Sequence, residues 1–338
     1  MLSIVLDEAV LNTPDYAVAR AFIRREYFVK AVISLPRDAF KDLAKTTAKT
    51  SILVLHRKPE PNVEQREPVF YARAESIGPS GRDVRRSNDL IAIAKAYAAW
   101  SRPLIDEGTR RKSVAEIPFC DDIMYQLAVD TAPAIMADML SAPGDRLDEP
   151  FRVKERLVRA MQEPVELRDL AALVAKGRTP PDRAVHDVAT ISRSDATVRY
   201  KATESLSYSS TQLQTLKEGD VVISGIDFVN GAIGVVPPNC DGMVVSKEFY
   251  ILRPNAEYDA HWLVAMLRSP KMRRIIEGTI TGTSNRTRVE SADVLMSLPV
   301  PKPPSKEDRR VIADTLRRAH ASTREASRLM SEVAKQTG

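Results

Sequence analysis

Side chains that could act as nucleophiles or as general acids and bases are few and scattered in this sequence. Its four histidines lie far apart, and none of them stands in a recognised motif with a serine, a cysteine or a carboxylate; they are His56, His186, His261 and His320. A catalytic triad is recognised by its geometry, and the spacing of these residues gives no indication of one. We therefore predict structural or surface roles for the histidines and no catalytic residue in this chain.

The two cysteines, Cys120 and Cys240, are too few for a disulfide framework, and neither has a histidine or a second cysteine at metal-ligand spacing. We interpret both as incidental thiols, because free cysteine behaves as a small hydrophobic residue. An acidic pair followed by a lysine, which would suit a nuclease, is not identifiable. The sequence therefore predicts no metal and no other cofactor bound by this chain alone.

Basic and amide side chains in the second half of the chain are candidates for contact with DNA. Arg286 and Arg288 follow the small polar run 282–285. Such a loop can approach a phosphate backbone closely, and arginine donates paired hydrogen bonds to phosphate or guanine. Three further candidates lie on a predicted helix, where a solvated surface is the alternative interpretation. The predicted contacts are Ser224, Asn230, Lys247, Lys271, Arg273, Arg274, Ser284, Asn285, Arg286 and Arg288.

The net charge of +5 is unevenly distributed over the 338 residues. Residues 1–150 carry 21 basic and 22 acidic side chains, whereas residues 151–338 carry 29 and 23. A basic domain suits a polyanion because neutralised phosphates release condensed counterions. A soluble, basic domain without a nucleic-acid partner is the alternative interpretation of the same charge.

Composition and the first residues indicate a cytoplasmic protein. With 43% hydrophobic and 28% charged residues, the chain has the composition of a soluble globular protein. No apolar run approaches the roughly 18 residues of a membrane span, and acidic residues stand where a secretory signal would be basic. We therefore expect no membrane partner.

The first hundred residues alternate predicted strands with predicted helices. A helix is expected to begin at Thr13, with Thr13 as its cap and Pro14 in its first turn, and another begins at Asn88. The predicted strands are apolar throughout and comprise residues 3–6, 31–35 and 51–55. This pattern predicts a parallel or mixed sheet that is covered on both faces by helices.

From about Val165 the pattern becomes that of a β-rich domain with glycine-containing turns. Predicted strands comprise residues 221–223, 232–236, 243–245 and 249–252, and a helix is expected from about Asp259 to Ile276. A last helix begins after the proline-rich run 299–304, with Ser305 as its cap. Its apolar residues alternate by four and three, which is typical of a coiled-coil seam.

That seam predicts oligomerisation through the last helix, and its residues include Ile312, Leu316, Ala319, Met330 and Val333. The alternative is a single amphipathic helix docked on its own domain, because three heptads are close to the minimum for a coiled coil.

Both halves of the chain resemble type I restriction-modification proteins. The first hundred residues are similar to the late catalytic region of the modification subunits, which are N6-adenine DNA methyltransferases. The similarity is carried, in order, by residues 3–6, Leu11-Asn12, residues 30–36, Phe40, residues 49–55, Gly78, Gly81-Arg82-Asp83 and Asn88-Asp89-Leu90. Asp7 departs from this pattern, because such proteins usually have proline there.

Residues from about Leu167 onward resemble one half of a type I specificity subunit, which is a target-recognition domain followed by a spacer helix. The matching features are Leu170, Gly177-Arg178-Thr179-Pro180, Gly219-Asp220-Val221, residues 246–249, Gly282-Thr283-Ser284, Arg286, Arg288, Leu298-Pro299-Val300-Pro301 and Val311-Ile312-Ala313. One departure is Asp308 after Glu307, where the family commonly has glutamine.

Methyl transfer to adenine requires a glycine-rich turn for S-adenosylmethionine and a polar-Pro-Pro-aromatic loop that holds the extruded base. The run from Asn12 to Tyr16 has suitable residue types at the wrong spacing, and it is better explained as a helix cap with a first-turn proline. The run from Gly225 to Gly234 is followed by β-type residues rather than a helix, so it is not a dinucleotide loop. In the family both motifs precede the region matched here, so S-adenosylmethionine is expected only in the complete enzyme.

The resemblance implies an α/β fold: a partial Rossmann-like methyltransferase sheet, then an α+β target-recognition domain and a long, coiled-coil-like C-terminal helix. The predicted segments are a methyltransferase fragment (1–100), a helical connector (101–163), a target-recognition domain (164–304) and a spacer or oligomerisation helix (305–336). Without neighbouring strands, the first sheet is expected to expose apolar faces and an unpaired edge.

The predicted function is sequence-specific recognition of double-stranded DNA within a type I-like restriction-modification complex. The expected partners are a modification subunit or a second copy, bound through the last helix, and a restriction subunit. One alternative is that this is the trailing part of a fused modification and specificity polypeptide that is itself an S-adenosylmethionine-dependent adenine methyltransferase. Another is a scaffold that binds only protein.

Overall fold

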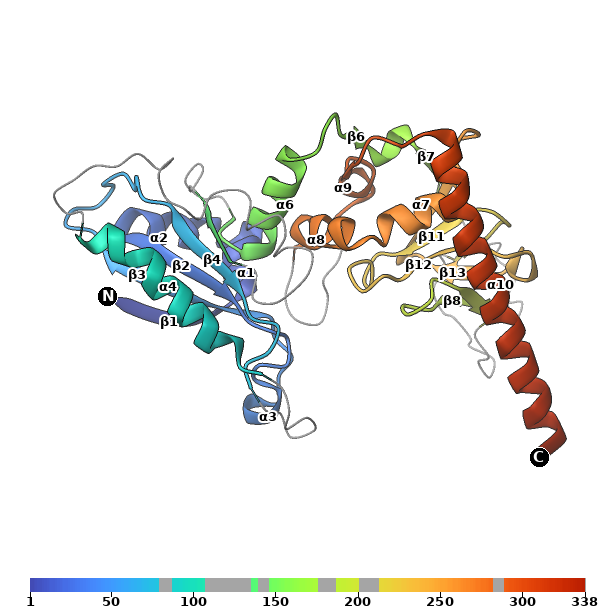
Figure 1. Cartoon of the computed structure of the whole chain (residues 1–338), viewed down its shortest axis with the longest axis horizontal. Coiled ribbons are helices and arrows are strands. Elements are labelled where there is room, and N and C mark those ends of the chain that lie inside the picture. Colours follow the sequence, from blue (N-terminus) through green and yellow to red (C-terminus); the bar gives the residue numbers. More distant parts are fainter. Residues whose placement is uncertain are drawn as a thin grey trace. The chain divides into compact units, whose positions relative to one another are not determined.

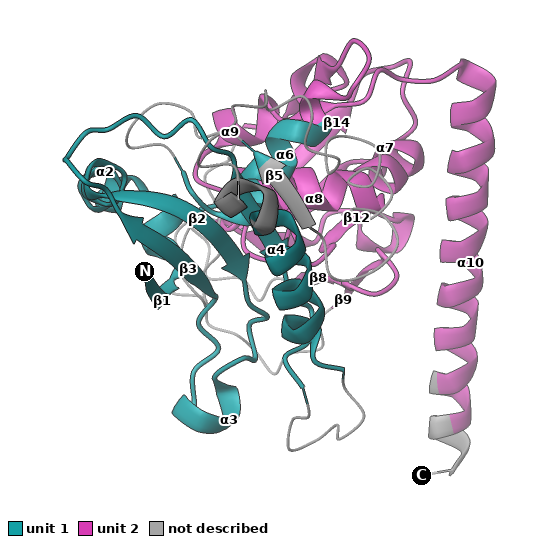
Figure 2. Ribbon diagram, turned by 60° about the vertical axis from the view of Figure 1, so that its left-hand side comes forward, with its two compact units in different colours: residues 1–157, 280–287 teal, residues 158–279, 288–338 magenta. Residues whose placement is uncertain are grey.

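The structure is a computed structural model that describes residues 1–78, 87–106, 135–138, 146–175, 187–200, 213–281 and 289–337. The chain divides into two compact units (Figure 2). Unit 1 comprises residues 1–157 and 280–287, and unit 2 comprises residues 158–279 and 288–338. The described helices include none that is both long enough and apolar enough to span a membrane. The functional division into four segments stays a prediction.

Unit 1 is built around a five-stranded mixed sheet with the order β1-β3-β2-β4-β5 (Figure 1). Its strands are β1 (Leu2–Asp7), β2 (Tyr27–Ser34), β3 (Thr50–Arg57), β4 (Val69–Arg73) and β5 (Ile135–Asp138). Strands β2 and β4 pair in parallel, and the other three pairings are antiparallel. Of the two sheet types predicted, the mixed one is therefore observed, and all three predicted strands form.

A helical crossover joins β1 to β2, which run in the same direction with β3 between them. It consists of α1 (Glu8–Asn12), the 3-10 turn η1 (Pro14–Tyr16) and α2 (Ala17–Glu26). The prediction that Thr13 caps a helix is wrong, because its hydroxyl donates to the Ala9 carbonyl at 3.0 Å and makes no cap bond to η1. Thr13 instead ends α1, a short helix that the apolar pattern did not indicate.

Helices lie on both faces of the unit 1 sheet, as the sequence predicts. The predicted helix after Asn88 is α4 (Asp89–Asp106), and its Tyr97 and Trp100 rings pack on Phe70 of β4 at 5.3 and 5.5 Å between centroids. On the other face, Glu149 at the start of α6 (Glu149–Arg159) accepts a hydrogen bond from Arg73 of β4 at 3.0 Å. A short helix, α3 (Lys41–Ala44), lies between β2 and β3 in the chain.

Strand β1 forms an edge of this sheet and is apolar on both of its faces. Leu2, Ile4 and Val5 are 43%, 37% and 46% exposed. Among the described strands, β1 pairs with β3 alone. Val18 and Phe22 of α2 are exposed as well. The expected apolar, unpaired edge is thus present.

Unit 2 contains a four-stranded antiparallel sheet with the order β12-β11-β14-β7 (β7, β11 and β12 in Figure 1, β14 in Figure 2). Its strands are β7 (Ala171–Leu173), β11 (Val221–Ser224), β12 (Ile233–Val235) and β14 (Phe249–Pro254). The four strands predicted within residues 221–252 all form. Three of them are β11, β12 and β14 of this sheet, and the other is β13 (Val244–Ser246). Val222, Val245 and Ile251 pack in one buried apolar cluster, and Val244 of β13 packs in another with Val188 and Leu213.

Three two-stranded ribbons and several short helices complete unit 2. The ribbons pair β8 with β9, β10 with β13, and β6 with β15. The bounds of the elements not yet given are β6 (Val165–Glu166), η3 (Leu167–Asp169), β8 (Ala189–Ile191), β9 (Val198–Tyr200), β10 (Leu213–Thr215), η4 (Pro238–Cys240), α9 (Ala292–Met296) and β15 (Pro299–Val300).

The single helix predicted from about Asp259 to Ile276 is wrong, because two helices occupy this stretch: α7 (Ala260–Leu267) and α8 (Pro270–Thr279). Pro270 has no amide hydrogen to continue α7 and suits the first turn of a new helix. The Ser269 hydroxyl accepts a hydrogen bond from the Met272 amide at 3.3 Å and so caps α8. Arg268, between the two helices, is thereby brought to the end of α7.

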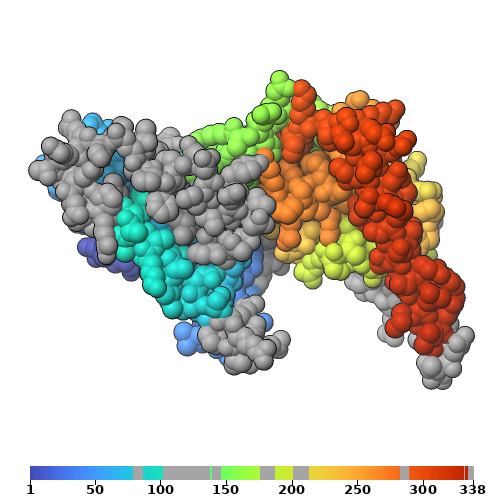
Figure 3. All heavy atoms as spheres, viewed as in Figure 1, coloured from blue at the N-terminus to red at the C-terminus, as the bar shows by residue number. Residues whose placement is uncertain are grey.

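The last helix, α10 (Lys306–Thr337), begins as predicted, since the Ser305 hydroxyl accepts from the Asp308 amide at 3.2 Å. Its first half is docked on α7: Ala313 and His320 are buried, and the Arg309 guanidinium lies over the ring of Tyr258 at 5.0 Å. Figure 3 shows the atoms of α10 along the surface of unit 2. The first half of α10 is therefore an amphipathic helix docked on its own domain, which was the alternative interpretation of its sequence.

The residues of the predicted seam lie mostly away from this docked face. Ile312, Met330 and Val333 are 41%, 71% and 53% exposed. Ala319 is exposed too, whereas Leu316 is half-buried at the border of the two faces. Oligomerisation through this stripe stays a prediction.

Candidate nucleic-acid interface

Three segments of unit 2 meet at the end of its sheet where β11 finishes. The Gly225 amide donates to the Glu248 carbonyl at 2.8 Å, and the Val289 amide donates to the Gly225 carbonyl at 3.0 Å. A β-carbon placed on Gly225 would lie 2.6 Å from the Glu248 carbonyl oxygen, so only glycine allows this approach. The turn after β11, the turn between β13 and β14, and the chain that follows residue 288 are therefore held together.

One predicted DNA contact lies in a turn at this junction. Lys247 is exposed in the turn between β13 and β14, next to Glu248. Four further predicted contacts lie outside the described residues; they are Ser284, Asn285, Arg286 and Arg288.

The β8–β9 hairpin packs beside the same sheet through its loop. The Ser192 amide donates to the Thr197 carbonyl at 2.9 Å, and the Asp195 carboxylate accepts from the Thr197 amide at 3.0 Å and from its hydroxyl at 2.7 Å. Burial opposes ionisation of Asp195, but hydrogen bonds from Ser192 and Thr197 and the charge of Arg199 outweigh it and lower the pKa of the carboxyl group. The loop is thus fixed by internal bonds.

Arg268 joins this hairpin loop to the turn between β11 and β12. One terminal nitrogen of its guanidinium donates to the Gly231 carbonyl, and the other donates to the carbonyls of Arg193 and Ser194 at 3.0 and 3.1 Å. We call residues 192–196 and 225–231 the clamped loops. Burial, followed by the nearby charge of Arg273, lowers the pKa of Arg268 from its ordinary value.

The clamped loops carry exposed polar and basic side chains side by side. Arg193 and Asp227 form an ion pair across the two loops at 3.6 Å, and the Asn230 amide donates to the same carboxylate at 2.9 Å. The Arg193 side chain is 63% exposed, and Arg199 and Tyr200 at the end of the hairpin are about half exposed. A guanidinium, an amide and an aromatic ring are the groups that read bases and hold phosphates.

The other predicted contacts have varied surroundings. The Ser224 hydroxyl is mostly buried and accepts from the Asp227 amide at 3.1 Å, so it stabilises the turn that begins one of the clamped loops. Arg274 is partly buried and forms an ion pair with Glu277 at 3.0 Å. Lys271 is half-buried, whereas Arg273 is exposed and lies near Arg268. The contacts of all these residues with DNA stay predictions.

Sequence reasoning missed Arg193, Arg199, Tyr200 and Arg268. The hairpin that carries the first three has strands of only three residues each, too short for alternation to stand out. A signal was available in the Ser-Asp pair of residues 194–195, because both residue types favour turns between apolar segments. No local pattern indicates Arg268, since the carbonyls that it binds are 37 and 75 residues away.

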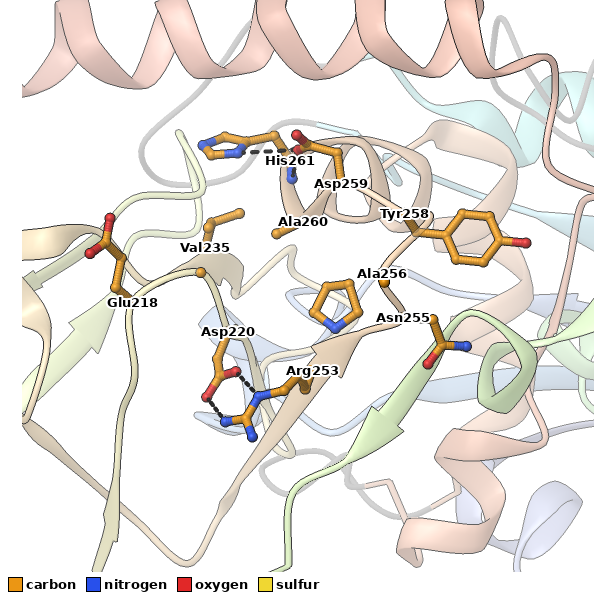
Figure 4. Close-up of a pocket in the computed structure, with 12 residues that line it drawn as sticks. Glu218, Asp220, Val235, Arg253, Asn255, Ala256, Tyr258, Asp259, Ala260 and His261 are labelled. Carbon is orange, nitrogen blue, oxygen red and sulfur yellow. Dashed lines mark hydrogen bonds and ion pairs between the residues drawn. The ribbon is translucent and has the colours of Figure 1, made fainter.

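A pocket of about 430 Å³ lies at the other end of the sheet, where β11 begins (Figure 4). The Asp220 carboxylate accepts two hydrogen bonds from the Arg253 guanidinium, each at 3.0 Å. The Asp259 Oδ1 atom lies 3.5 Å from the Nδ1 atom of His261. Glu218 adds a third carboxylate to the lining. Arginines pair with two of these carboxylates, Arg253 with Asp220 and Arg317 with Asp259, so most of the negative charge of the lining is neutralised. Within the described residues, no group of three or more histidine, cysteine or carboxylate side chains is arranged to hold a metal ion.

No protein-family model matches the chain, and no curated protein matches it in sequence. Among solved structures, one similar chain comes from work on complex assembly and conformational transition of the type I R-M system, with 22% identity, a TM-score of 0.35, and 53% of this chain and 47% of that chain covered. The HsdS subunit from Thermoanaerobacter tengcongensis is 15% identical with a TM-score of 0.26, and 53% of this chain and 44% of that chain are covered.

The type IIG restriction endonuclease BpuSI is 11% identical with a TM-score of 0.38, and 93% of this chain and 42% of that chain are covered. The chain thus spans less than half the length of each of these proteins. Identities and scores this low do not establish a shared fold.

Proposed function

We propose that this chain recognises a specific sequence in double-stranded DNA as part of a type I-like restriction-modification complex that methylates adenine at N6. The observation that carries the proposal is the pair of clamped loops in unit 2. Arg268 fixes two segments that are distant in sequence, and these segments present Arg193 and Asn230 together on the surface.

Base recognition needs polar groups at fixed positions, because a bidentate hydrogen bond distinguishes bases only when its direction is set. Arginine pairs with the O6 and N7 atoms of guanine, and asparagine pairs with N6 and N7 of adenine. Arg193 and Asp227 form an exposed ion pair with a long separation of 3.6 Å. Such a pair contributes little stability, so Arg193 can replace it by a contact with DNA at a small loss of free energy. Arg273 and Lys247 are exposed and suit phosphate contacts.

Unit 1 is, within the same proposal, the trailing part of the methyltransferase sheet. The parallel strands β1 and β2 with their helical crossover support this assignment, since such units build doubly wound sheets. The carboxyl end of β1 does not fit S-adenosylmethionine: Asp7 caps α1 by accepting from the Ala9 amide at 2.9 Å, and Glu8 is buried against the hydroxyls of Ser34 and Ser51. No step of methyl transfer is therefore assigned to this chain, and the cofactor belongs to the complete enzyme.

The exposed stripe of α10 is the surface proposed for assembly with a modification subunit or a second copy. A stripe of apolar side chains on a charged helix is suited to pairing with another helix. A restriction subunit is a further partner expected of the complete complex.

Binding to a labelled pool of random duplexes tests the DNA proposal. We expect the affinity of the full chain to fall steeply from low to physiological salt, because phosphate contacts release counterions. Arg273→Gln should reduce the slope of log affinity against log salt by roughly 1 and weaken all sequences alike. Lys306→Gln, an exposed charge change at the start of α10, is the matched control and should leave the slope unchanged. Binding at low salt no tighter than that of a neutral protein would contradict the proposal.

A further inference from the structure

We propose that Arg268 is a positioning residue for DNA recognition, which holds the clamped loops in one arrangement so that Arg193 and Asn230 meet DNA as a unit. This inference rests on the proposed function of unit 2 and adds how its surface discriminates between sequences. Arg268 would act without touching DNA itself.

The bonds of Arg268 go to main-chain carbonyls rather than to side chains. Its two terminal nitrogens reach three carbonyls, one in the turn between β11 and β12 and two in the β8–β9 loop. A main-chain acceptor fixes the path of a loop, whereas a side-chain acceptor can rotate away. Because the guanidinium is planar and presents its donors in a rigid fork, the distance between the two loops is set by the shape of one group.

The place of Arg268 in the fold makes it a rigid anchor. It lies at the end of α7, where its own amide donates to the Val264 carbonyl at 3.0 Å, and Leu267 beside it is buried. A positive charge at the carboxyl end of a helix is also favourable. The clamp is therefore attached to the core of unit 2 rather than to either loop.

The loops approach each other closely at the clamp. Gly231 has a φ of +83°, which favours glycine, and a β-carbon there would lie 3.4 Å from both the Arg193 carbonyl oxygen and the Arg268 guanidinium. Asp227 lies in the same turn and binds both Arg193 and Asn230. Loss of the clamp would thus change the relative position of the two side chains proposed to read bases, while the exposed Arg273 would keep its place on α8.

The first experiment measures amide hydrogen exchange in the full chain without DNA. In Arg268→Gln, amides of residues 192–197 and 225–232 should exchange faster than in the wild type, and amides of α8 and β14 should be unchanged. Arg268→Lys should behave like Arg268→Gln, because one ammonium group cannot span carbonyls on both loops. Lys306→Gln serves as the control and should exchange like the wild type. Unchanged protection of both loops in Arg268→Gln would overturn the inference.

The second experiment selects bound duplexes from the random pool and compares the affinity for the enriched duplex with the affinity for the unselected pool. Arg268→Gln should lower this ratio roughly 10- to 100-fold, the effect of losing about one bidentate base contact, and should retain the salt slope of the wild type. Arg273→Gln should do the reverse, with a smaller slope and a retained ratio. If Arg268 had only a structural role, its substitution would lower the affinity for the enriched duplex and for the unselected pool by the same factor.

Gly231→Ala provides a second route to the same clamp if Arg268→Gln does not fold. It strains the turn from the opposite side and should also lower the ratio at an unchanged slope. If the wild type enriches a sequence and neither variant changes the ratio, the inference is wrong while the proposed function stands. If the wild type binds no duplex at low salt, both are wrong.

Discussion

Gly225 illustrates how a single residue sets the geometry of the sheet end in unit 2. Its amide and carbonyl bind two different segments, and a β-carbon would enter the space of the Glu248 carbonyl, which accepts the hydrogen bond from the Gly225 amide. Gly225→Ala should therefore destabilise unit 2 by ~1–3 kcal/mol, as overpacking does in other cores. Thermal unfolding followed by circular dichroism measures this loss.

Gly219→Ala is the matched control for this prediction. Gly219 has a φ of +82°, but a β-carbon there would meet no atom within 4 Å, so backbone strain alone remains. Its cost should be about 1 kcal/mol. Equal or greater destabilisation by Gly219→Ala would show that the contact at Gly225 can relax.

The docking of α10 on α7 includes two histidines whose rings lie 5.6 Å apart between centroids, His261 and His320. Burial is the main cause that lowers the pKa of each below the ordinary value of 6.5. Positive neighbours lower these pKa values further: Arg317 beside His261, and Arg324 and Arg268 beside His320. Asp259 and Asp195 act in the opposite direction, and the backbone of Asp195 hydrogen-bonds to His320.

Unit 2 should consequently lose stability as the pH falls below the ordinary histidine value. Between the lowered pKa of the folded state and 6.5, the unfolded chain binds more protons, so the free energy of unfolding decreases with falling pH. Each kcal/mol lost should lower Tm by ~2–4 °C in a protein of this size. The measurement is Tm for wild type and His320→Gln from neutral pH to about pH 5. If the variant lost as much stability over this range as the wild type, His320 would not be responsible.

The two faces of α10 should respond differently to substitution. Exposed seam residues contribute little to the docked state, so a triple change to serine at Ile312, Met330 and Val333 should alter unfolding by only ~0.5 kcal/mol per site. Self-association through α10, or binding of a modification subunit to α10, should be lost in sedimentation velocity. Ala313→Arg, on the buried face, should instead lower Tm and leave the seam intact. Association that survives the triple change would place the interface elsewhere.

At the level of elements, the prediction of helix boundaries failed where one helix ends within a few residues of the start of the next. Pro270 ends one helix and begins another, while the apolar period runs through the break. Thr13 ends α1, although its position before a proline suggests the start of a helix. In α10 the docked face contains Arg309 and His320, which hydropathy does not identify as core, so the sequence could not decide which of two stripes is buried.

At the scale of the whole molecule, exposed apolar surface on unit 1 should govern the behaviour of the chain in solution. The β1 edge presents Leu2, Ile4 and Val5 beside main-chain groups that no other described strand pairs with, a combination that favours edge-to-edge association. Val5→Lys should increase the fraction of monodisperse chain in size-exclusion chromatography at the same loading. Thr190→Lys, on the exposed side of a hairpin in unit 2, adds the same charge and should not. Equal improvement by both variants would indicate a general effect of net charge.

Although β4, β5 and the β8–β9 hairpin were not predicted, seven strands of the two units could be, because each of them is a local apolar run. Their pairing could not, since it depends on contacts between distant segments: β4 pairs with β5 across some seventy residues, from Val69 with Asp138 onward. The same holds for the candidate interface. Lys247 and Asn230 could be identified from the sequence as polar residues next to strands. Arg193 becomes a candidate only through the hydrogen bond that Arg268 makes to its carbonyl across the fold.

The order of strands in unit 1 has a consequence for the time course of folding. Leu2 pairs with Leu55 and Asp7 with Thr50, so β1 can pair with β3 only after β3 has been made. Pairings between segments so distant in sequence give a high contact order, and such topologies close slowly. During synthesis β1 therefore lacks its pairing with β3 until some fifty further residues have emerged. This interval is when a chaperone would have most to protect.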